Sequence, residues 1–182
     1  EIGGEFSYDR QVFGVNDEDR ITSRTYAGTF AWYIWNFLAL ELNYSESEDI
    51  LTRNENQVID SANNIVLVNY QSRAKINTYG AGLRLALSGR NAYIQPVISL
   101  GYAQQITESV SDANYTFNGT PILIQDIEPA TRTDNVFATF MLKFRLTRMM
   151  SITGSVRTVI PAFETEQAEN NLRYSAGLSW ML

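Results

Sequence analysis

The chain has 182 residues, of which 45% are hydrophobic and 19% charged, and its formal net charge is −6. The acidic balance excludes general nucleic-acid binding, which needs a basic surface. Cysteine and histidine are both missing, which excludes a disulfide framework, thiolate chemistry, histidine-based catalysis and the commonest transition-metal ligand. The length fits one domain, residues 1–182, with a sizeable core or a single closed barrel.

Apolar residues alternate with small or polar residues along most of the chain, which is the period of a β-strand. In chain order, this period predicts strands over residues 2–9, 26–34, 38–44, 79–87, 93–102, 136–146, 150–160 and 172–182. No run approaches the ~18 consecutive apolar residues that a membrane-spanning helix requires. The sequence therefore predicts an all-β fold of eight antiparallel strands.

Charged residues are confined to one face of these predicted strands. A Lys or Arg facing lipid at mid-bilayer costs about 2–4 kcal/mol, so this segregation is what a membrane barrel with a polar interior requires. We expect the following charges to lie inside and to act as a plug or a gate: Glu5, Glu41, Arg84, Lys143, Arg145, Arg157 and Arg173. The interior of an eight-stranded barrel is just wide enough for side chains to fill it, which favours a plug over a narrow ion path.

Alternation alone does not say which face meets the core, because a soluble lipocalin-like barrel has its apolar face inside. Aromatic residues near the predicted strand ends favour the membrane, since such rings prefer the headgroup level. The expected girdle consists of Tyr8, Tyr26, Trp32, Tyr44, Tyr79, Tyr102, Tyr174 and Trp180.

Short and long connections alternate strictly. Residues 35–36, 88–91 and 147–149 form tight turns, while residues 10–25, 46–70, 103–134 and 161–171 form long polar connections. All tight turns then lie at one end with both chain ends, as in outer-membrane barrels with short periplasmic turns. Asn118 and Gly119 between β-prone runs predict the tip of a hairpin in the third long connection.

Together these segments resemble the small eight-stranded bacterial outer-membrane proteins, such as the OmpA transmembrane domain, OmpX and OmpW. The closing segment 172–182, with Trp180 near its end, is similar to the C-terminal strand of that family, although the family usually ends in Phe and this segment ends in Leu182. The resemblance implies an up-and-down transmembrane barrel in the cell outer membrane, with both termini periplasmic. It also implies contact with outer-membrane lipid and lipopolysaccharide, and we expect a monomer.

The function expected from the sequence is a non-enzymatic structural or surface-interaction role through protruding loop hairpins. No compact nucleophile–base arrangement is visible, and we expect no cofactor and no metal. The acidic residues 17–19 and 46–49 are expected to be solvated rather than to bind Ca²⁺. A narrow channel or conduit for small solutes or hydrophobic molecules is the first alternative, and a soluble ligand-binding barrel is the second.

Two local features do not fit a regular strand. Pro96 lies in mid-strand, where it removes a ladder hydrogen bond, and a bulge is the expected solution. Near residues 73–76 the apolar face appears to change sides.

Overall fold

The structure is a computed structural model that describes residues 1–13, 19–53, 57–60, 65–89, 92–161 and 172–181. The strands of the described residues are β1 (Ile2–Phe13), β2 (Asp19–Tyr33), β3 (Leu38–Arg53), β4 (Gln57–Asp60), β5 (Ile65–Ala86), β6 (Ile94–Phe117), β7 (Thr120–Arg145), β8 (Met150–Pro161) and β9 (Leu172–Trp180). Among these residues there is no helix long and apolar enough to cross a membrane.

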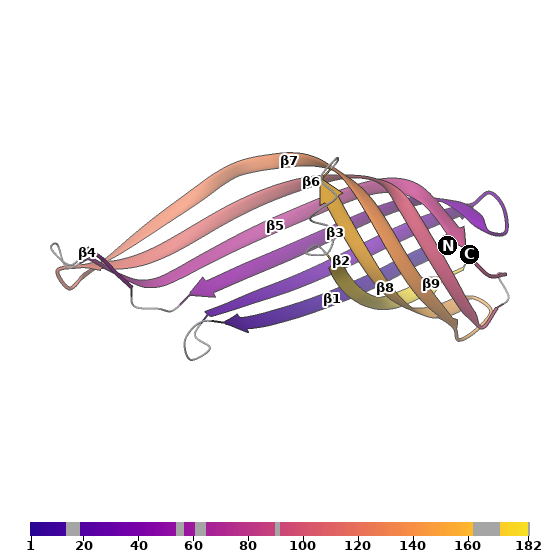
Figure 1. The fold of residues 1–182 in the computed structure, drawn as a ribbon, viewed down its shortest axis with the longest axis horizontal. Coiled ribbons are helices and arrows are strands. Elements are labelled where there is room, and N and C mark those ends of the chain that lie inside the picture. The colour runs from indigo at the N-terminus through magenta and orange to yellow at the C-terminus, as the bar shows by residue number, and fades with distance from the viewer. Residues whose placement is uncertain (14–18, 54–56, 61–64, 90–91, 162–171, 182) are drawn as a thin grey trace.

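Eight of these strands close into an antiparallel barrel. With β4 set aside, strands that follow one another in the chain are paired, β3 with β5 among them, and the pairing of β9 with β1 closes the ring. The short strand β4 is the ninth and adds to β5 outside the barrel. This confirms the predicted eight-stranded up-and-down barrel. Both chain ends lie at the end of the barrel where the turns are short (Figure 1).

The apolar face of the barrel points outward. Along β3, for example, Leu40 and Leu42 are exposed while Glu41 and Asn43 are buried. On β5 and the residue that follows it, the apolar outer face runs over nine residues, from Tyr79 to Leu87. At about 3.4 Å per residue and a tilt of about 40°, this stretch is about 21 Å tall, near the ~25 Å apolar band of membrane barrels.

Three strands continue far beyond the others. β5, β6 and β7 have 22, 24 and 26 residues, whereas β8 has 12 and β9 has 9. Their outer parts form a projecting sheet that we call the blade: β4 with residues 65–76, 106–117 and 120–133. Figure 1 shows the blade extending from the barrel with β4 near its tip, opposite the chain ends.

The structure shows that three of the predicted long polar connections consist largely of strands. Much of the ranges 10–25, 46–70 and 103–134 is regular strand. Outside the apolar band the backbone ladder continues while the apolar alternation of the outer face ends. The apparent change of face near residues 73–76 has the same origin, because the register of β5 with β3 is unbroken there. Ile76 lines the interior cavity, and Arg73 and Lys75 are exposed.

The predicted bulge at Pro96 is wrong. Pro96 pairs with Leu142 in an unbroken register, and its carbonyl accepts a hydrogen bond from the backbone N–H of Leu87 at 2.9 Å. In an antiparallel ladder the N and the carbonyl of a residue point to the same neighbour, which here is the β5 side. Because β5 ends at Ala86, the proline nitrogen lies just beyond that strand and costs no ladder bond.

Candidate functional site

A network of buried charges closes the barrel near its turn end. Arg84 donates from Nε to Glu41 Oε2 at 2.6 Å and from Nη1 to Glu1 Oε1 at 3.0 Å. Lys143 Nζ lies 2.6 Å from the same Glu1 oxygen. Ser99 donates to Glu41 at 2.7 Å, and Tyr33 donates to Glu1 at 3.1 Å. We call these residues the charge plug.

The charge plug is almost completely removed from solvent. The side chains of Arg84, Glu1, Glu41 and Lys143 are between 1% and 4% exposed. Buried charge is tolerated when it is paired and hydrogen-bonded, and removing one partner costs about 3–5 kcal/mol. The two cations and two carboxylates of the plug are paired across strands β3, β5 and β7 and the residue preceding β1, while Nη2 of Arg84 has no hydrogen-bond partner.

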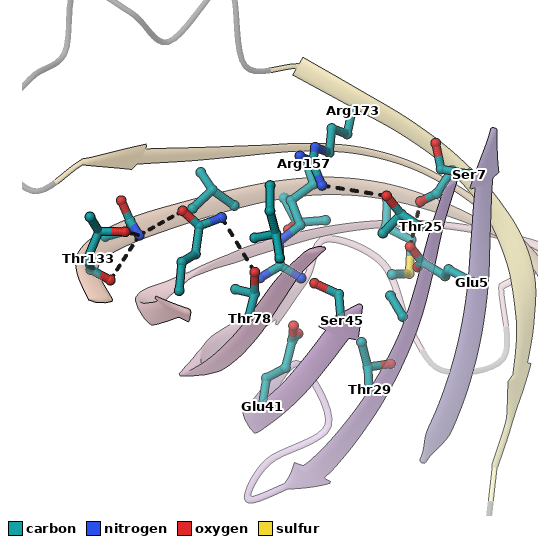
Figure 2. A pocket seen from close by; sticks show the side chains of 18 residues that line it. Glu5, Ser7, Thr25, Thr29, Glu41, Ser45, Thr78, Thr133, Arg157 and Arg173 are labelled. Carbon is teal, nitrogen blue, oxygen red and sulfur yellow. Dashed lines mark hydrogen bonds between the residues drawn. The ribbon is translucent and has the colours of Figure 1, made fainter. Parts of the chain in front are cut away.

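Above the plug lies a polar cavity of about 330 Å³. Figure 2 shows its lining from strands all around the barrel, with Arg157 and Arg173 on one side and Glu41 at the other end. Arg157 and Arg173 are direct cross-strand partners on β8 and β9. Arg157 donates from Nη2 to Asn43 Oδ1 at 2.8 Å, while its buried Nε has no hydrogen-bond partner.

An aromatic ring supports Arg157 from inside the barrel. The guanidinium carbon lies 4.7 Å from the centroid of Phe137, which is fully buried. Cation–π attraction of this kind is worth about 0.5–2 kcal/mol. Gly101 makes room for the ring, since a Cβ at that position would come within 2.6 Å of Phe137 Cε1.

The remaining cavity charges are held differently. Ser155 and Ser175 donate to Glu5 Oε2 at 2.8 and 2.6 Å. Arg173 lies at the rim, where Nη1 is 3.5 Å from Thr25 Oγ1 and Nη2 is 3.9 Å from Asp49 Oδ2. Its side chain is 38% exposed, so Arg173 is reachable from the open end of the cavity.

The structure divides the seven residues predicted to lie inside into three groups. Glu41, Arg84 and Lys143 belong to the charge plug, and Glu5, Arg157 and Arg173 line the cavity. Arg145 belongs to neither. It lies at the turn end and donates to the carbonyls of Thr147 and Arg148 at 3.0 and 3.4 Å.

Several interior residues were missing from the predicted set. Glu1 and Glu5 are four residues apart, so their side chains lie on the same face of a strand. The alternation of the strand could therefore have identified Glu1 as an inner residue. Tyr33 and Phe137 are aromatic side chains on the inner face. They were missing because the predicted set contained only charged residues.

The eight residues predicted for the aromatic girdle are all exposed, between 41% and 67%. The tyrosines lie toward the blade end of their strands, whereas all three tryptophans, Trp32, Trp35 and Trp180, lie toward the turn end. The apolar band is thus bordered by tyrosine on one side and tryptophan on the other. Trp35 and Tyr93, also exposed at the turn end, were not in the predicted girdle.

The hairpin tip lies where the sequence placed it. Asn118 and Gly119 join β6 to β7 with φ angles of 49° and 79°, which the type I′ turn requires at both central residues. Beyond the barrel β7 pairs only with β6, because its pairing with β8 begins at Asn135. Residues 120–134 are all exposed and have no strand on their other side among the described residues.

Two acidic residues of β3, Glu46 and Glu48, form ion pairs with cations of β5. Lys75 Nζ lies 2.8 Å from Glu46, and Arg73 Nε lies 3.4 Å from Glu48. The hydrogen bond and the charge of Lys75 lower the pKa of Glu46, and Glu46 in turn raises the pKa of Lys75. No cluster of acidic side chains suited to a metal ion occurs in the part of the chain that the structure describes. Residues 17 and 18 lie outside that part.

Comparison with solved structures assigns the fold. The N-terminal β-barrel domain of Pseudomonas aeruginosa OprF matches 98% of this chain and 96% of its own, with a TM-score of 0.53 and 11% identity. The fold is that of a small outer-membrane β-barrel. Ail of Yersinia pestis gives a TM-score of 0.49 at 10% identity, covering 98% of this barrel and 94% of Ail. Neisserial surface protein A gives 0.44 at 10% identity, covering 100% and 96%.

Sequence comparison adds nothing to this assignment. No protein-family model matches the barrel sequence, and no curated protein matches it.

Proposed function

We propose that this protein is a non-enzymatic, monomeric barrel of the bacterial outer membrane that binds a surface partner through its blade. In this proposal the turns and both chain ends face the periplasm, and the blade stands outside the cell. The observation that carries the proposal is the edge of β7 along residues 120–134, which no other strand of the described residues covers.

A free strand edge offers a row of unpaired N–H and C=O groups to an incoming strand. Leu123 and Ile127 on this edge are 64% and 68% exposed, and Ile122 and Ile124 are also exposed. These side chains would thus make apolar contacts with a partner strand, in addition to its backbone hydrogen bonds with the edge. Pro121 and the later Pro129 lack the N–H donor, which leaves residues 122–128 as the uninterrupted stretch for a partner strand.

Membrane placement rests on the outward apolar band and its aromatic borders. Acyl chains would contact the band, and the exposed arginines above it would meet lipopolysaccharide phosphates. The outward apolar face also argues against a soluble lipocalin-like barrel, because the apolar face of such a barrel would point inward. If the placement is right, the purified protein requires detergent and migrates differently on gels with and without heating. A protein that stays monodisperse in plain buffer contradicts it.

Partner binding is tested on the edge itself. The protein in lipid nanodiscs is exposed to immobilised β-strand-forming peptides, and binding of the wild type is compared with Ile124→Asp and Ile127→Asp. Both variants should lose most of the binding, because a desolvated charge replaces an apolar contact. Thr131→Asp, which adds the same charge outside residues 122–128, is the control and should bind normally. Unchanged binding by both edge variants would sink the proposal.

The channel alternative requires an open path through the interior of the barrel. The charge plug leaves the polar cavity without a continuation to the turn end. We therefore propose a closed barrel, and planar-bilayer recordings of the wild type should show no reproducible unitary conductance. Unitary conductance that disappears on changing Arg84 or Arg157 would establish the channel instead.

A further inference from the structure

The pairing between β1 and β9 is much shorter than the strands on either side of it. β1 pairs with β9 only over Ile2–Phe6, whereas it pairs with β2 as far as Phe13. β9 pairs with β1 only as far as Ala176, whereas it pairs with β8 up to Leu172. Residues 7–10 and 172–175, which would continue this register, therefore form an unpaired seam in the barrel wall.

A crevice occupies this seam and borders the interior cavity. It has a volume of about 290 Å³ and is lined from β1, β2 and β9. Ser7, Thr25 and Arg173 line both the crevice and the polar cavity. Its outer side is formed by Tyr8, Leu172 and Tyr174, all exposed. The seam thus connects the cavity to the surface at the height of the tyrosine border.

The two cavity arginines have no close carboxylate partner among the described residues. Arg157 and Arg173 are direct cross-strand partners, and like charges placed so are destabilising. Arg157 forms no ion pair with any described residue, and Arg173 is 3.9 Å from Asp49. The carboxylate of Glu5 is turned to the hydroxyls of Ser155 and Ser175 instead.

An anion between the two guanidinium groups would remove their repulsion and accept a hydrogen bond from the buried, unpartnered Nε of Arg157. The cavity volume lies at the lower end of the range for small-molecule sites. An anionic headgroup fits this polar interior, and an apolar tail fits the outer side of the seam. Asp9 at the outer end of the crevice disfavours a second negative charge.

We propose that the seam between β1 and β9 is a lateral portal through which a singly anionic, single-chain amphiphile enters from the membrane and binds Arg173 and Arg157. Its headgroup lies in the polar cavity, and its chain passes between Tyr8 and Tyr174 into the bilayer. This proposal rests on the membrane placement proposed above but is independent of partner binding by the blade.

The binding site is tested with dansylundecanoic acid, whose fluorescence reports transfer from nonionic detergent micelles to the protein. The wild type should bind it saturably. Arg173→Gln should weaken binding about tenfold or more, as expected for losing one charge-assisted hydrogen bond. Arg73→Gln is the matched control, because Arg73 is an exposed arginine of β5 that pairs with Glu48, and its affinity should be unchanged. Equal affinity of the wild type and Arg173→Gln would overturn the site.

The route is tested by closing the seam. Because the chain has no cysteine, a disulfide can be introduced cleanly. Ser7→Cys with Ser175→Cys continues the register in which Glu5 pairs with Gly177. Oxidation should slow probe uptake at least tenfold, and reduction should restore it. The pair Gln71→Cys and Asp112→Cys, which are register partners in β5 and β6, is the control. Uptake unaffected by the seam disulfide would refute lateral entry.

Competition separates a lipid from a free anion. Inorganic phosphate or sulfate at millimolar concentration should not displace the probe, and the neutral dansylated alcohol should not bind. Displacement by either inorganic ion would show a site for dissolved anions and contradict the portal. A separate observation tests the membrane placement itself. If the protein remains monodisperse without detergent, that placement is wrong.

Discussion

At the scale of single residues, the barrel contains two charge arrangements with different chemistry. In the charge plug each cation has a carboxylate within 3.0 Å, which makes it a structural element. In the cavity, Arg157 and Arg173 face each other without such a carboxylate. This arrangement suits the anion-binding site proposed above. The composition of the inner face alone does not distinguish the two, because both draw on the same residue types.

Arg84 is the residue whose loss should destabilise the plug most. Arg84→Gln leaves Glu41 and Glu1 buried with one cation fewer, so that the free energy of unfolding should fall by about 3–5 kcal/mol. The measurement is urea-induced unfolding in lipid vesicles, followed by tryptophan fluorescence. Arg73→Gln breaks an exposed pair, whose side chains are 58% and 41% exposed, and should cost less than 1 kcal/mol. Equal losses in both variants would contradict a structural role for the plug.

Lys75 controls the protonation of Glu46 above the apolar band. Because the ammonium group lowers the pKa of this carboxyl, Lys75→Gln should raise that pKa toward its ordinary value. The pair therefore stabilises the folded state above the ordinary pKa of a glutamate, and this contribution is lost as the pH falls through the lowered folded-state value. A pH titration of the Glu46 carboxyl carbon by NMR measures the shift. An unchanged pKa in the variant would show that the ion pair does not form in solution.

At the scale of elements, the sequence predicts those parts of the strands that cross the apolar band. Leu40, Leu83 and Leu100 reveal their strands because the outer face of the barrel is apolar there. In the blade that apolar face ends, and Arg73 or Lys75 takes the place of leucine on a strand of unchanged register. The long strands β5, β6 and β7 were therefore visible only in part.

The partners within the barrel could not be predicted from the sequence. Which inner residues meet depends on how each strand is staggered against the next. The pairing of Arg84 with Glu41 and the opposition of Arg157 and Arg173 both follow from that stagger. Strand parity alone identified most charged inner residues but not their neighbours, nor the early end of the β1–β9 ladder.

The turn at the tip of the β6–β7 hairpin should fix the register of the outer blade. Gly119→Val places a β-branched residue at a φ of 79° and should cost about 1–2 kcal/mol. Amide hydrogen exchange should then become faster in residues 110–117 and 120–127, with unchanged protection in the barrel. Asn118→Gly, which tolerates positive φ, should leave protection as in the wild type. Uniform protection in Gly119→Val would show that side-chain packing rather than the turn sets this register.

At the scale of the whole molecule, three layers follow one another along the barrel axis. The charge plug and the tryptophans lie toward the turn end, the polar cavity lies within the band, and the seam opens at the height of the tyrosines. The blade continues this axis away from the barrel (Figure 1). Each proposed role depends on one physical arrangement, in which the apolar outer face contacts lipid while the inner face stays polar.

Spin labels on single cysteines test that arrangement most directly, because the chain contains no cysteine of its own. Labels at Leu42, Leu83 and Leu100 in vesicle-embedded protein should collide often with oxygen and rarely with a water-soluble nickel chelate. A label at Leu123 in the blade should show the reverse. If the three band positions were instead as accessible to the nickel chelate as Leu123, the outer face would be in water, and the membrane barrel proposed here would be wrong.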